Sequence, residues 1–165
     1  MDTGRMAARY QDKVENTEPL LLTWNARIIY SDSGIIRAKL STPLMHDYTF
    51  KDGIMRTMPS GLTVYLFEVD GKEAGTLVAD SGVIHSQREE VSAYGRVIFV
   101  NPQNEQLRTS ELHFNTNTYL LFTDAFVTLQ KGDEVLYGQG LEATDKFSKL
   151  KIRKPMGQFF IEDAD

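Results

Sequence analysis

Regularly spaced turn residues constrain the fold of this chain more than any other feature of its sequence. From Trp24 onward, runs rich in Val, Ile, Leu, Thr, Tyr and Phe are separated every 6 to 10 residues by groups such as Ser31-Asp32-Ser33-Gly34 and Lys131-Gly132-Asp133. Glycine and asparagine accept the backbone angles of tight turns, which suits hairpin connections. After Val14 no stretch repeats apolar residues at helical spacing. The pattern predicts an all-β fold, a twisted antiparallel jelly roll.

The segments between the turns are the expected strands. Side chains at i and i+2 share one face of a strand, so each segment offers an apolar face to a common core. The expected strands are Trp24–Tyr30, Ile35–Ser41, Leu62–Val69, Gly75–Ile84, Arg96–Asn101, Leu107–Phe114, Tyr119–Thr123, Phe126–Lys131, Val135–Glu142 and Lys149–Lys154.

The length of 165 residues fits a single domain. Residues 1–19 are polar, with a short helix conceivable around Met6 to Val14, and we expect them to form a tail or linker ahead of a domain spanning residues 20–162. No apolar run reaches the ~20 residues of a membrane helix. The N-terminal segment also lacks the apolar core of a signal peptide, so we expect any targeting or anchoring segment to be absent from this sequence.

Charge and composition exclude several function classes. The net charge of −5 argues against a nucleic-acid partner, because phosphate binding needs a basic surface. The densest basic stretch runs from Lys149 to Lys154, where Leu150 and Ile152 alternate with the cations, as on one solvated strand face. The chain has no cysteine, which excludes disulfides and thiolate chemistry.

No catalytic or metal-binding constellation stands out. The histidines, His46, His85 and His113, are too far apart in sequence to form a ligand pair on one element, and they are expected at the surface or between strands. A nucleophilic serine motif and a phosphate-binding glycine loop are both missing. Asp80 and Glu111 on neighbouring strands keep a carbohydrate-active enzyme open as an alternative. We expect a protein that is not an enzyme and uses no cofactor or metal.

Three acidic residues recur at an even interval. Asp80, Glu111 and Glu142 are each 31 residues apart, and a second strand region follows each of them after 13 to 15 residues. Those regions begin at Gly95, Ala125 and Pro155. Even spacing of this kind is typical of a two-strand unit whose copies stack along one axis.

Several of these segments resemble, in order, the motifs of the LptC family of lipopolysaccharide-export proteins. The block from Ala26 to Pro43 resembles the opening of that family, with a strand, an acidic turn ending in glycine and a second strand. The later motifs are Gly75–Gly82, Tyr94–Phe99, Leu107–Leu112, Phe122–Leu129 and Gly138–Ala143. The resemblance covers roughly residues 24–160 and is strongest to the Bacteroidota variants.

The resemblance implies an open β-taco, the OstA-like fold, whose apolar trough holds the acyl chains of lipopolysaccharide. It implies a periplasmic protein that receives lipopolysaccharide from an inner-membrane ABC transporter and passes it to the bridge protein LptA by strand pairing. Family members are anchored to the inner membrane by a helix or a lipid-modified cysteine, and residues 1–19 contain neither. Two alternatives stay open: another OstA-like component of the route, such as an LptA-like protein, or a β-sandwich adhesin or scaffold without lipid cargo.

Alternation along the strands gives the residues that this function would use. The expected lipid-binding residues are Ile36, Leu40, Leu77, Ala79, Val97, Phe99, Leu112, Phe114, Phe122, Val127, Leu129, Leu141 and Ile152, which could equally close a dry core. The expected partner edge is Lys149, Lys151, Arg153, Phe159 and Phe160, and the expected turn glycines are Gly34, Gly95 and Gly138. The free edge of the last strand is not strongly protected against pairing with another chain, so a partner could add a strand there.

Overall fold

The computed structural model describes residues 19–51, 53–144 and 149–161. The tail expected over residues 1–19 therefore lies outside the described residues except for Pro19, and so does the short helix conceivable around Met6 to Val14. The described residues confirm the all-β prediction, because they form one antiparallel sheet of 11 strands and contain no helix. Within those ranges there is accordingly no helix of the length and apolarity needed to span a membrane.

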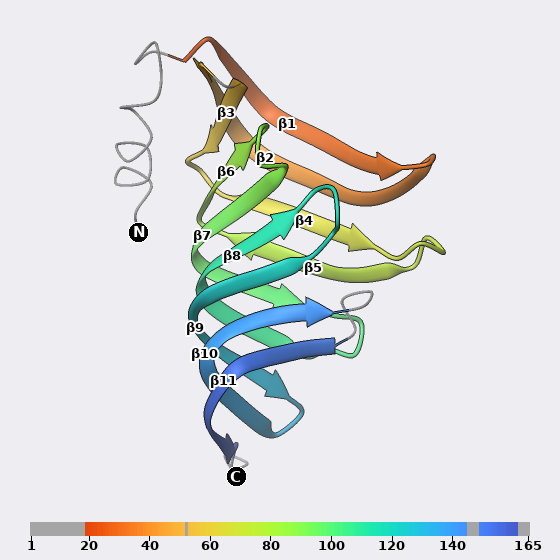
Figure 1. Ribbon diagram of the computed structural model, residues 1–165, viewed down its shortest axis with the longest axis vertical. Helices are drawn as coiled ribbons and strands as arrows, with labels where there is room; N and C mark the ends of the chain where they lie inside the picture. Colours follow the sequence, from red (N-terminus) through yellow and green to blue (C-terminus); the bar gives the residue numbers. More distant parts are fainter. Residues whose placement is uncertain (1–18, 52, 145–148, 162–165) are drawn as a thin grey trace.

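The strands follow one another along the chain with short connections (Figure 1). Their bounds are β1 Leu21–Asp32, β2 Ile35–Phe50, β3 Gly53–Met58, β4 Leu62–Phe67, β5 Glu73–Ala79, β6 Ser81–His85, β7 Glu90–Val100, β8 Gln106–Asn115, β9 Leu121–Lys131, β10 Glu134–Thr144 and β11 Lys149–Phe160.

The sheet is a meander of long strands that each bend once. β2 pairs with β3 through Tyr48 and Met55 and with β4 through Leu40 and Val64, so β3 and β4 are two parts of one bent strand. β7 likewise pairs with both β6 and β5, which makes those two the next bent strand. Each strand thus contributes one segment to a first arm, which contains β4 and β5, and one to a second arm, which contains β3 and β6.

The bends line up into a corner that runs along the stack. In β7 the pairing with β8 jumps from Tyr94 to Val97, and in β10 the pairing with β9 jumps from Gln139 to Leu141. Extra residues of this kind bend a strand and increase its twist. Figure 1 shows the strands stacked along the long axis and curving around one side, with β1 at one end of the stack and β11 at the other. We call the side opposite the corner the mouth.

The corner explains the interval of 31 residues. Asp80 lies between β5 and β6, Glu111 lies within the irregular pairing of β8 with β9, and Glu142 follows the irregular pairing in β10. Two bent strands with their turns make up one interval, so each acidic residue occupies the same place in successive copies. The predicted stacking of a two-strand unit is confirmed by this register.

The strand predictions differ from the structure in several places. β2 continues beyond the expected end at Ser41 to Phe50, and the expected strand Gly75–Ile84 is divided into β5 and β6. β3 and the segment from Glu90 to Gly95 in β7 were not expected as strands, since both are poor in adjacent β-branched residues and their pairing is set by neighbouring strands. The segments Tyr119–Thr123 and Phe126–Lys131 belong to one bent strand, β9, which begins at Leu121. β11 continues beyond Lys154 to Phe160.

Candidate functional site

The space between the arms is filled by one continuous apolar cluster. It draws residues from strands β1 to β11, and the side chain of Phe99 at its centre is fully buried. Ten of the predicted lipid-binding residues belong to this cluster and are buried: Leu40, Leu77, Val97, Phe99, Leu112, Phe114, Val127, Leu129, Leu141 and Ile152. If the arms move apart and hydrocarbon enters this space, it would therefore contact those side chains.

The other three predicted residues have different surroundings. Ala79 is partly buried and packs against the cluster. Ile36 lies at the mouth end of β2 and is 39% exposed, because β4 pairs with β2 only as far as Ala38. Phe122 was expected on the inner face, but its ring stacks on His113 with centroids 5.4 Å apart, on the opposite face from Leu121. Phe122 thus does not line the interior in this structure.

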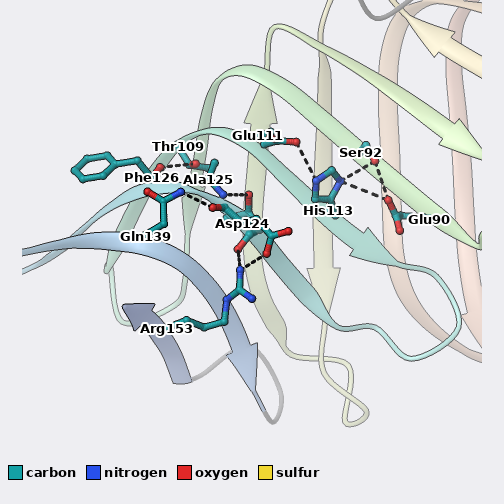
Figure 2. A network of polar contacts seen from close by, with 11 residues as sticks. Glu90, Ser92, Thr109, Glu111, His113, Asp124, Ala125, Phe126, Gln139 and Arg153 are labelled. Carbon is teal, nitrogen blue, oxygen red and sulfur yellow. Dashed lines mark hydrogen bonds and ion pairs between the residues drawn. The ribbon is translucent and has the colours of Figure 1, made fainter. Parts of the chain in front are cut away.

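Two Arg–Asp ion pairs hold the corner. Near the middle of the stack, both Nε and Nη2 of Arg96 donate to the Asp80 carboxylate at 2.9 Å. Near the C-terminal end, Arg153 donates to Asp124 and to the Thr123 carbonyl oxygen, as Figure 2 shows for Asp124. These contacts join neighbouring or next-neighbouring strands where the backbone ladder is interrupted, and so they stabilise the bend.

The hydrogen bond from Arg96 lowers the pKa of Asp80 below its usual 3.8. The contribution of this pair to folding is present above the ordinary carboxyl pKa and is lost as the pH falls through the lowered folded-state value. Arg96→Gln removes the donor, so we expect the pKa of Asp80 to return toward its ordinary value. Titration of the side-chain carboxyl ¹³C resonance measures both values, and an unchanged midpoint would show that the pair does not form in solution.

The predicted turn glycines have two different roles. Gly34 and Gly95 have φ angles of +82° and +79°, which glycine adopts readily. Gly138 is not in a turn: it lies inside β10, and a side chain there would collide with the backbone of Lys154 and with Ile152. Position 138 requires glycine because β11 passes too close for a side chain, and not because of its backbone conformation.

The stack has a free edge at each end. β11 pairs only with β10, and β1 pairs only with β2, among the described strands. Exposed apolar side chains gather at both ends: Met156, Phe159, Phe160 and Ile161 on or after β11, and Leu20, Leu21, Leu22, Trp24 and Ile29 on or before β1. Trp24 is 70% exposed and Phe160 is 64% exposed, values that are unusual for large apolar residues at a monomer surface.

The residues predicted to form a partner edge all lie on β11. Lys149, Lys151, Phe159 and Phe160 lie on β11, and both phenylalanines are exposed. Arg153 also lies on β11, but its guanidinium reaches across Gly140 to β9. It therefore braces the corner and does not face the free edge. The edge at β1 was not predicted; the run Leu20-Leu21-Leu22 before Trp24 was the available signal.

A polar network on the outer face of the second arm links β7 to β8 (Figure 2). His113 Nδ1 lies 2.8 Å from the Ser92 hydroxyl and 3.5 Å from Glu90, and its Nε2 lies 3.1 Å from Glu111. Ser92 is buried, so its oxygen is shielded from solvent. The predicted cross-strand position of His113 is confirmed, and the network joins neighbouring strands.

The mouth carries aromatic and charged side chains. Burial raises the pKa of Tyr30 to about 12, against a smaller lowering by Arg56, and Tyr30 packs against the apolar cluster. Arg56 Nε donates to the buried Asp47 carboxylate at 3.3 Å. Burial also raises the pKa of Tyr119, which packs against the same cluster from the β8–β9 turn.

Comparison with known proteins identifies the family. The family described as "Lipopolysaccharide-assembly, LptC-related" matches residues 8–154, which is most of the chain. No curated protein matches the sequence. The all-β fold agrees with the β-taco that the resemblance of the sequence to this family implied. The chain therefore belongs to the LptC-related family of lipopolysaccharide-assembly proteins and is a component of lipopolysaccharide export.

Proposed function

We propose that residues 20–162 form the periplasmic domain of an inner-membrane-anchored protein that receives lipopolysaccharide from an ABC transporter and passes it to an LptA-like bridge protein. The observation that supports this most directly is the apolar cluster enclosed between two arms of one open-ended sheet. Acyl chains entering between the arms replace contacts between side chains with contacts to hydrocarbon.

Burial of hydrocarbon is the main source of affinity in this proposal. Each buried methylene contributes about 0.8 kcal/mol, so a dozen contribute on the order of 10 kcal/mol before ordering costs. An exposed ion pair contributes at most about 1 kcal/mol. The net charge of −5 is therefore compatible with an anionic lipid as cargo.

The open ends of the stack support transfer between proteins. Unpaired strand edges are templates for addition of a strand from a partner. β11 leaves such an edge beside exposed Phe159 and Phe160, and we propose that it docks the bridge protein. A continuous sheet across the junction would join the apolar interiors of the two proteins.

Photocrosslinking in cells tests this function. A photoreactive phenylalanine analogue is placed at Phe114 inside the cluster, at Ile36 at the mouth, and at Tyr65, which is exposed on the outer face of β4. We expect lipopolysaccharide adducts at Phe114 and Ile36 and none at Tyr65. Folded protein without adducts at either inner position would instead favour a scaffold without lipid cargo.

A further inference from the structure

Arg37 is an extra residue in β2 at the mouth. Tyr30 of β1 lies opposite Ala38 and Ser31 lies opposite Ile36, so Arg37 has no partner in β1. A bulge of this kind redirects the side chain that it carries. Without it, alternation would point Arg37 away from the face shared by Ile36 and Ala38.

The redirected side chain connects the two arms. Arg37 Nε donates to the Phe67 carbonyl oxygen of the first arm at 3.1 Å. Its guanidinium carbon lies 4.4 Å from the centroid of the Tyr119 ring, which belongs to the β8–β9 turn of the second arm. A guanidinium over an aromatic face is a favourable contact. The contact between Arg37 and Tyr119 thus spans the mouth.

Local hydrogen bonds shape the turn that carries Tyr119. Tyr119 has a φ of +60°, and its N–H donates to the Asn115 carbonyl oxygen at 2.8 Å. The Asn115 side chain accepts from the N–H groups of Asn117 and Thr118. The Tyr119 ring also packs on Phe114, with centroids 5.8 Å apart, so the apolar interior begins directly behind it.

The guanidinium of Arg37 has no carboxylate partner among residues 19–51, 53–144 and 149–161. Arg56, also at the mouth, is by contrast paired with Asp47. The terminal nitrogens of Arg37 make no hydrogen bond within the described part of the chain, although the side chain is partly buried. A planar guanidinium with free terminal N–H groups is suited to bind an oxyanion through two parallel hydrogen bonds.

We propose that Arg37 binds the oxyanion headgroup, such as a phosphate, of an amphiphile whose hydrocarbon chain enters past Tyr119 between the arms. This inference rests on the proposed function, and it assigns the headgroup a specific place at the mouth. The amphiphile displaces Tyr119 from the guanidinium, and its anionic group takes the ring's place. The exposed Ile36 beside Arg37 then contacts the first methylenes of the chain.

Titration of the purified protein with two single-chain amphiphiles, below the concentration at which they form micelles, tests the proposal. Decyl phosphate and decyl maltoside share the same hydrocarbon chain and differ in headgroup charge. Arg37→Gln is expected to weaken decyl phosphate binding about tenfold or more and to leave decyl maltoside binding unchanged. Arg37→Lys keeps the charge but not the planar guanidinium. Its affinity for decyl phosphate is expected to lie between those of the wild type and Arg37→Gln.

Lys39→Gln is the matched control, because Lys39 is a neighbouring cation on β2 that lies over the Phe67 ring and is exposed. Lys39→Gln should change neither the affinity for decyl phosphate nor the affinity for decyl maltoside. The proposal is overturned if Arg37→Gln weakens both amphiphiles alike or neither, or if inorganic phosphate alone binds as tightly as decyl phosphate. Failure of the wild-type protein to bind either amphiphile would instead contradict the proposed function itself.

Discussion

Replacing Phe99 with Ala is expected to lower the free energy of unfolding by about 3–5 kcal/mol, the usual result of truncating a fully buried aromatic residue. Phe99 is 0% exposed and pairs with Leu77 on one side and Leu107 on the other. Its ring occupies the space above Gly75, where any side chain would collide with it. Little can therefore move in to fill the cavity that the substitution leaves.

Urea unfolding of the two proteins measures the difference. Phe126→Ala is the control, since Phe126 is 49% exposed on β9 and its removal is expected to change stability by no more than about 0.5 kcal/mol. A loss for Phe99→Ala as small as that of the control would mean that the arms do not share a packed interior.

Introducing charge at the C-terminal edge is expected to abolish most binding to an LptA-like partner. In the double variant Phe159→Asp, Phe160→Asp, two exposed aromatic side chains beside the free edge of β11 become anions. Large aromatic residues often dominate interface energies, so we expect at least a tenfold loss of affinity. The fold should be retained, because neither side chain belongs to the apolar cluster.

Trp24→Asp provides the matched control at the opposite end of the stack. Trp24 is also exposed but lies on β1, so this variant should bind the bridge protein as the wild type does. Binding assays with purified components compare the three proteins. Equal loss in both variants, or in neither, would show that β11 is not the docking edge.

Local sequence patterns were sufficient for the fold class and for most of the interior. Turn residues and alternation placed Leu77, Phe99 and Leu129 on strands with an inward face, and the structure buries all three in one cluster. The interval joining Asp80 to Glu111 also indicated the stacked unit. Turns and alternation depend on residues close in sequence, and the interval is a repeat along the sequence itself, which is why these features could be predicted.

Features that depend on register between strands could not be predicted. Phe122 was expected to face inward, but the irregular pairing between β8 and β9 places it beside His113. Arg37 is redirected to the mouth by a bulge that becomes visible only when β1 and β2 are paired. Arg153 fits an alternating strand face in sequence, yet it turns toward Asp124 because Gly140 leaves room for it.

The central claim is that the space between the arms admits hydrocarbon, and paramagnetic NMR tests it most directly. A fatty acid with a nitroxide on its chain is added to protein with labelled Leu and Val methyl groups. We predict strong broadening of the methyl signals of Leu77, Leu112 and Leu129, which are buried between the arms, and little at Val78 on the outer face of β5. Broadening confined to Val78 and other exposed methyl groups would contradict the account.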